Sequence, residues 1–77
     1  MNVQVLGPGC ANCEATVALI ERVARAKGLD VTVEKVDDLP TIMGYGVVAT
    51  PGIVIDGAVV HAGGRPSRNE IERLLGA

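Results

Sequence analysis

The residues of this chain best suited to chemistry are its two cysteines, Cys10 and Cys13, which form a Cys-x-x-Cys motif. Two thiols at this spacing can close into a disulfide and be reopened by exchange with a disulfide of another molecule. The bridge would be a weak structural staple, because in the loop-entropy model closing a four-residue loop stabilises a fold by only about 2 kcal/mol. A small secreted domain also normally carries more disulfides, which close longer loops. The pair therefore favours redox chemistry.

The motif follows a short apolar segment and precedes a helical pattern. Val3 to Leu6 is rich in β-branched residues and stops at Gly7-Pro8-Gly9, which predicts a strand with a sharp exit. A helix is predicted from about Ala11 to Lys27, so Cys10 lies at or just before its first turn. There, unpaired N–H groups and the positive end of the helix dipole stabilise a thiolate. We expect a lowered pKa to make Cys10 the attacking sulfur, and Cys13, more buried and facing the sheet, to resolve the mixed disulfide.

The rest of the chain predicts the elements that must hold this motif in place. The β-branched run from Val31 to Val36 indicates a second strand, and Asp37 to Pro40 indicates the start of a short helix. Ile53 to Val60 indicates a hairpin that turns at Asp56-Gly57, a pair suited to positive φ at both turn centres. The run from Ser67 to Glu70 has capping-box spacing for a last helix. The predicted order is β-α-β-α-β-β-α, and its strand–helix–strand start favours a parallel crossover.

Length, composition and charge limit the size of the protein and its partners. With 77 residues we expect one domain, spanning residues 1–77. Nine acidic residues against seven basic ones, no basic cluster and a single aromatic residue give nucleic-acid binding no support. No apolar run approaches the roughly 20 residues of a membrane helix. The first residues also lack the pattern of a secretion signal, so we expect no membrane association and a cytoplasmic protein.

These motifs together make the chain similar to the thioredoxin/glutaredoxin superfamily, and most similar to its small, glutaredoxin-sized members known as redox-active disulfide proteins. The resemblance rests on the run from Gly7 to Cys13, on Ala49 to Gly52, and on the hairpin, the double glycine Gly63-Gly64 and the last helix that follow. It implies an α/β thioredoxin-like fold, with a four-stranded mixed sheet and helices on both faces. It also implies that Pro51 is cis and that the backbone of Thr50 binds the substrate chain.

The activity that the resemblance implies is thiol–disulfide exchange with protein or small-molecule disulfides, without a prosthetic group. Electrons would come from a thiol reductase or from a low-molecular-weight thiol. The chain departs from thioredoxins, which usually have Trp before the first cysteine and Gly-Pro between the two. It also departs from glutaredoxins, which usually have an aromatic residue inside the motif; here Ala11-Asn12 fills that place.

Metal binding is the main alternative function for the same pair. Two thiolates suit Cu(I), whereas zinc would need more ligands, and His61 is the only imidazole in the chain. Heavy-metal-associated domains, the copper chaperones, share the outline of the first 36 residues. They end in a strand, however, where this chain is predicted to end in a capped helix. An adaptor whose thiols bind arsenic and a pair of incidental cysteines are the remaining alternatives.

Overall fold

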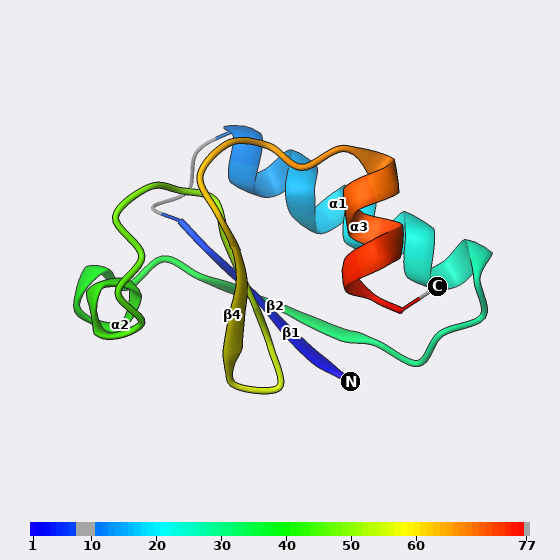
Figure 1. Ribbon diagram of the computed structural model, residues 1–77, viewed down its shortest axis with the longest axis horizontal. Coiled ribbons are helices and arrows are strands. Elements are labelled where there is room, and N and C mark those ends of the chain that lie inside the picture. Colours follow the sequence, from blue (N-terminus) through cyan, green and yellow to red (C-terminus); the bar gives the residue numbers. More distant parts are fainter. Residues whose placement is uncertain (8–10, 77) are drawn as a thin grey trace.

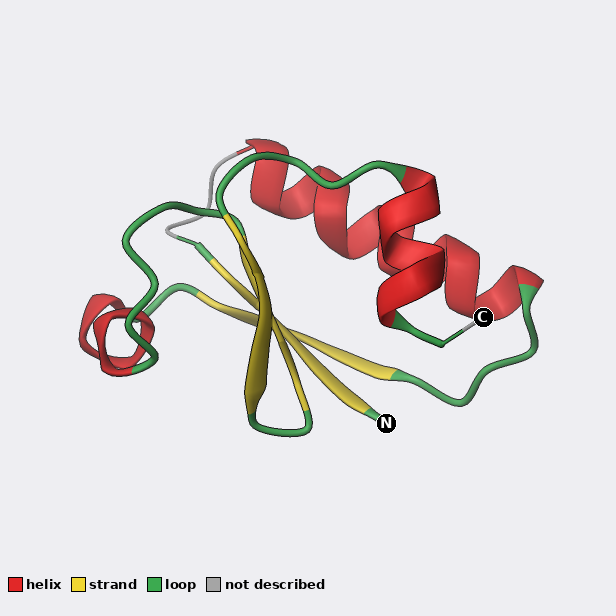
Figure 2. Cartoon of the chain, in the orientation of Figure 1, coloured by secondary structure: helices red, strands yellow, loops and turns green. Residues whose placement is uncertain are grey.

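The chain folds around one four-stranded sheet, and the computed structural model describes residues 1–7 and 11–76. The elements follow the predicted order β-α-β-α-β-β-α (Figures 1 and 2). The strands are β1 (Asn2–Leu6), β2 (Thr32–Val36), β3 (Gly52–Ile55) and β4 (Ala58–Ala62), and the helices are α1 (Ala11–Ala26), α2 (Leu39–Gly44) and α3 (Arg68–Leu74).

The sheet has the strand order β2-β1-β3-β4, which makes β1 an inner strand. β1 is parallel to β2 and antiparallel to β3, so the sheet is mixed and the predicted parallel pairing is confirmed. Successive side chains of a strand point to opposite faces. Val3 and Val5 accordingly join a core made with residues of α1 and α3, whereas Leu6 joins a second core made with Ile42 of α2. The predicted α/β fold with helices on both faces is confirmed, and Figure 1 shows α1 and α3 side by side with α2 apart from them.

Helix α1 presents one buried face to the sheet and carries Cys13 in its first turn. Residues three or four positions apart share one side of a helix, which is why the buried positions repeat at that spacing. Val17 is partly buried and packs against the same core. The buried positions are Cys13, Thr16, Ile20, Val23 and Ala24.

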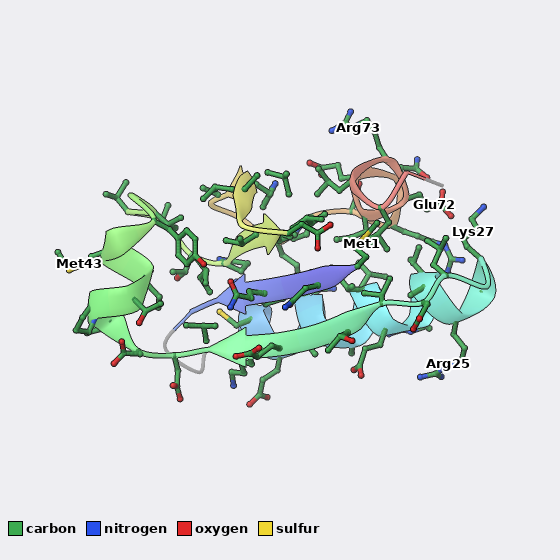
Figure 3. All side chains as sticks on the ribbon, turned by 90° about the horizontal axis from the view of Figure 1, so that it is seen from below. Met1, Arg25, Lys27, Met43, Glu72 and Arg73 are labelled. Carbon is green, nitrogen blue, oxygen red and sulfur yellow. The ribbon has the colours of Figure 1, made fainter. Side chains whose placement is uncertain are left out.

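Helix α3 packs on α1, and an ion pair joins it to the residue that follows α1. Lys27 Nζ lies 3.8 Å from Glu72 Oε2 (Figure 3). Within α3, Arg68 Nε lies 3.4 Å from the same oxygen. Exposed ion pairs of this kind contribute little each, so the burial of Ile71 against the α1 core does more to hold the helix.

The hairpin of β3 and β4 turns where the sequence predicts. Asp56 and Gly57 have φ of 48° and 89°, the positive values that a type I′ turn needs at both centres. Asp56 Oδ1 also accepts a hydrogen bond from the backbone N–H of Asn2 at 2.9 Å, which ties the turn to the start of β1. Within residues 1–7 and 11–76, no helix is long and apolar enough to cross a membrane.

Candidate functional site

Cys13 is the part of the cysteine motif that the structure describes. Its side chain is 0% exposed and belongs to the core between α1 and the sheet, as the sequence predicts for the more buried cysteine. The predicted nucleophile, Cys10, lies outside the described residues, so its expected place before the first helical turn and its lowered pKa stay predictions. The described half of the motif thus sits at the end of β1, on the face that α1 covers.

The loop that precedes β3 contains the other two predicted site residues. The Thr50–Pro51 peptide bond is cis, as the family resemblance implies. Pro51 is buried and Thr50 is partly buried. Solvent therefore reaches Thr50 only in part, whereas the Pro51 ring lies inside the fold.

Gly7 lies next to both this loop and Cys13. A β-carbon built on Gly7 would overlap Cys13 Sγ, and it would lie 3.2 Å from Cys13 Cβ and 3.7 Å from Thr50 Cβ. The end of β1, the first turn of α1 and the loop before β3 therefore meet at one point. Two residues that the sequence selects separately, Cys13 and Thr50, share this neighbour.

The first residue of the double glycine supports the same loop. The backbone N–H of Gly63 donates to the carbonyl of Pro51 at 3.1 Å. Gly63 has a φ of +85°, and a β-carbon there would come within 3.1 Å of Ala49 Cβ. In the sequence, Gly63 belongs to the double glycine that contributes to the family resemblance; its contact with the loop is a tertiary feature that no local pattern signals.

Thr16 is a buried polar residue of the site that the sequence analysis missed. Its side chain is 0% exposed, and its hydroxyl donates to the carbonyl oxygen of Asn12 at 2.7 Å. Asn12 lies between the two cysteines and in the first turn of α1, so this bond joins the motif's backbone to the next turn of the same helix. The available signal was spacing, because Thr16 follows Cys13 by three positions and so shares its helix face.

Glu14, beside Cys13 in the sequence, and His61, the chain's single imidazole, each have a partner. Glu14, one position after Cys13, forms an exposed ion pair with Lys35, with 3.6 Å between Oε1 and Nζ. His61 Nε2 lies 2.9 Å from the carbonyl oxygen of Gly64, which keeps the imidazole at its own strand end. Among the residues that the structure describes, no three His, Cys, Asp or Glu side chains group so as to hold a metal ion.

Comparison with known proteins relates the whole chain to thioredoxins. Residues 1–76 match the family described as thioredoxin domain. The chain is 32% identical over 75 residues to the thioredoxin of Methanothermobacter thermautotrophicus, covering 97% of each chain. It is also 32% identical over 73 residues to the thioredoxin of Methanocaldococcus jannaschii, covering 95% of this chain and 84% of that one.

A solved structure shows the same fold at lower sequence similarity. Thioredoxin 1 from the thermophilic eubacterium Thermosipho africanus superposes with a TM-score of 0.57 at 21% identity. The superposition covers 99% of this chain and 96% of that one. It supports the thioredoxin fold of the chain.

Proposed function

Because this chain belongs to the thioredoxin domain family, we propose that it is a thiol–disulfide oxidoreductase in which Cys10 attacks and Cys13 resolves. Thiol–disulfide exchange is the general chemistry of the family. The observation that carries the finer assignment is the burial of Cys13 beside Gly7 and Thr50. A buried second sulfur is protected from incoming partners, so the first sulfur of the motif is the one that meets them.

The proposed reaction proceeds in two exchanges. The Cys10 thiolate attacks one sulfur of the partner's disulfide, and the partner's other sulfur leaves as a thiolate. The Cys13 thiolate then attacks the Cys10 sulfur of this mixed disulfide, and the partner's second sulfur leaves. The partner gains two electrons, Cys10 and Cys13 are oxidised to a disulfide, and the two thiol protons end on the partner's sulfurs.

The loop before β3 is the proposed binding element for the partner. We assign the backbone of Thr50 to pair with an extended segment of the partner chain, with Pro51 holding the loop in place. The bond from Gly63 to the Pro51 carbonyl supports this assignment, because it anchors the loop beside Cys13. The proposed unit of function is the whole domain, residues 1–77.

The proposed partners are protein or small-molecule disulfides, and a thiol reductase or a low-molecular-weight thiol restores the dithiol. Two electrons from that reductant reopen the Cys10–Cys13 disulfide, and no prosthetic group takes part. The proposed compartment is the cytoplasm, where thiols are kept reduced. Reduction potential decides the direction of exchange: a value near the −270 mV of thioredoxins marks an electron donor.

Single replacements of the two cysteines test the assigned roles. We expect Cys10→Ser to lower disulfide reduction to the rate of buffer alone, because the attacking sulfur is gone. Cys13→Ser still attacks but cannot resolve, so it accumulates a mixed disulfide with a model partner, detected as a covalent adduct by mass spectrometry. Full activity of Cys10→Ser, or an adduct that forms on Cys13, would reverse the assignment.

The competing function, Cu(I) carriage by the same pair, is tested on the same preparation. After anaerobic reconstitution with Cu(I), the bound metal is counted per chain and the wild-type pair is cycled with a dithiol. A pair that binds one Cu(I) and cannot be cycled between dithiol and disulfide would replace the proposed function with metal binding.

A further inference from the structure

Gly7 stands at a position where the strand pattern calls for a side chain. Val3, Val5 and Gly7 fall on the same face of the β1 strand, the face that α1 covers. The backbone N–H of Gly7 donates to the carbonyl of Val36 at 2.9 Å, which continues the pairing of β1 with β2 by one residue. Gly7 is buried. The first two positions of this face thus carry valine side chains, and the third carries none.

The backbone of Gly7 does not require glycine. The glycines with left-handed φ in the described chain are Gly28, Gly46, Gly57, Gly63, Gly64 and Gly76, and Gly7 is not among them.

What requires glycine at this position is space. A β-carbon on Gly7 would overlap Cys13 Sγ and would lie 3.2 Å from Cys13 Cβ, a separation tighter than nine in ten real contacts of a β-carbon. The Cys13 sulfur therefore occupies the volume that the missing side chain leaves.

We propose that Gly7 is a positioning residue for Cys13: the Cys13 sulfur fills the space that a side chain at Gly7 would take, and it keeps this place when the disulfide forms. This inference rests on the proposed function. A thiol can turn about its Cα–Cβ bond to relieve a contact, whereas a disulfide has a narrow range of dihedral angles and holds its sulfur in place. A methyl group at Gly7 therefore disfavours the disulfide more than the dithiol.

Gly7→Ala tests the inference through the redox equilibrium of the pair. Each protein is equilibrated with mixtures of reduced and oxidised glutathione, quenched with acid, alkylated and separated by mass. The protein dithiol gives two electrons and two protons to oxidised glutathione, which forms the protein disulfide and two molecules of reduced glutathione. We expect Gly7→Ala to shift the equilibrium at least about tenfold toward the dithiol, which equals a potential about 30 mV higher. A loss of overall stability that affects both redox forms equally would leave this equilibrium unchanged.

Gly44→Ala is the matched control, because it makes the same chemical change in open space. Gly44 is exposed at the end of α2, has no other atom within 4 Å of an added β-carbon, and lacks a left-handed φ. We expect its redox equilibrium to stay within about twofold of the wild type, as for an ordinary surface change. A Gly7→Ala equilibrium that also stays within about twofold would overturn the inference.

A double-mutant cycle with Cys13→Ala identifies the sulfur as the colliding group. Unfolding by urea is measured under excess reductant for the wild type, Gly7→Ala, Cys13→Ala and the double variant. We expect Gly7→Ala to lower the folding equilibrium constant at least about tenfold more in the wild type than in Cys13→Ala, because the overlapping atom is absent there. Equal losses in both backgrounds would show that the sulfur is not the colliding group and would overturn the inference.

The two experiments also separate this inference from the proposed function. If the single variant Gly7→Ala does not fold, the double variant tests the contact instead. We expect the double variant to fold, because it lacks the Cys13 sulfur. Its failure to fold would count against the sulfur contact. If the wild-type pair cannot be cycled, the proposed function fails while the cycle still tests the Gly7–Cys13 contact. If the wild-type pair cycles and Gly7→Ala leaves it unchanged, the inference about Gly7 fails alone.

Discussion

At the scale of single residues, Cys13 and Thr16 share the buried face of α1. Cys13 lies in the first turn of α1 and three positions before Thr16, so both side chains face the sheet and both are 0% exposed. Burial of a polar group costs free energy unless it is hydrogen-bonded. The Thr16 hydroxyl meets this requirement through the Asn12 carbonyl, within the motif itself.

Tyr45, the single aromatic residue, makes a side-chain bond that joins two distant segments. Its hydroxyl donates to Gln4 Oε1 at 3.0 Å, linking the end of α2 to the middle of β1. We expect Tyr45→Phe to lower the free energy of unfolding by about 1 kcal/mol, the usual contribution of such a bond. Urea unfolding measures the loss, and the same substitution in a Gln4→Met background is the control. A loss of the same size in that background would show that the bond to Gln4 is not its cause.

At the scale of the elements, α2 and α3 each begin at a residue whose side chain caps the first turn. Ser67 Oγ accepts from the Glu70 N–H at 3.2 Å, and Glu70 Oε1 accepts from the Ser67 N–H at 3.1 Å. Asp38 caps α2 in a similar way through the hydroxyl and N–H of Thr41. The capping box joins residues three positions apart, which is why the sequence predicts it, while the run from Asp37 to Pro40 indicates only that a helix starts there.

Removing the serine cap should loosen the last helix. We expect Ser67→Ala to cost about 1 kcal/mol in the free energy of unfolding, because the Glu70 N–H loses its acceptor. Ser67→Asp restores an acceptor and is expected to recover most of the loss. Chemical denaturation of the three proteins at pH 7 measures both effects, and equal stability of Ser67→Ala and the wild type would show that the cap is dispensable.

The same cap makes stability depend on pH in the acid range. The Ser67 backbone N–H, which donates to the Glu70 carboxylate, holds the pKa of Glu70 below its usual range. A carboxylate with a pKa lower in the folded state stabilises the fold fully above its unfolded pKa, and this contribution is lost as pH falls through the folded pKa. We therefore expect the free energy of unfolding to fall less steeply below about pH 4.3 in Glu70→Gln than in the wild type. Identical pH profiles would exclude a contribution from this carboxylate.

At the scale of the whole molecule, two small aliphatic cores lie on opposite faces of one sheet. The core under α1 and α3 includes Cys13, Ile20 and Ile71, and the core under α2 includes Leu6 and Ile42. A domain of this size has a total stability of roughly 4 to 12 kcal/mol, at 0.05 to 0.15 kcal/mol per residue. The burial of each large side chain in these cores therefore contributes a considerable share of the total stability.

Truncating one core residue tests this dependence. Ile20 is 1% exposed, and we expect Ile20→Ala to cost about 2 to 5 kcal/mol, since burial is lost and a cavity remains. Val48 is 100% exposed in the loop before β3, so Val48→Ala is the control and should change stability by less than about 0.5 kcal/mol. Thermal and urea unfolding measure both, and comparable losses in the two variants would contradict the assignment of Ile20 to the core.

Features that depend on neighbouring residues could be predicted from the sequence alone. The order of the elements, the type I′ turn at Asp56-Gly57 and the capping box at Ser67 are confirmed, because each arises from contacts within a few positions. The cis bond before Pro51 and the mixed sheet are also confirmed, although these came from the resemblance to a family. The roles of Cys10 and Thr50 in exchange stay predictions.

Only the tertiary structure decided which segments meet. The strand order β2-β1-β3-β4 and the contact of Gly63 with the loop at Pro51 join segments distant in the chain. The space that Gly7 leaves for Cys13 depends on how the end of β1 and the first turn of α1 pack together. Periodicity tells which side of a strand or helix is buried, but it does not tell what packs against that side. For the same reason the sequence indicates Gly7 only as the end of a strand, while in the folded protein Gly7 lies against the sulfur of Cys13.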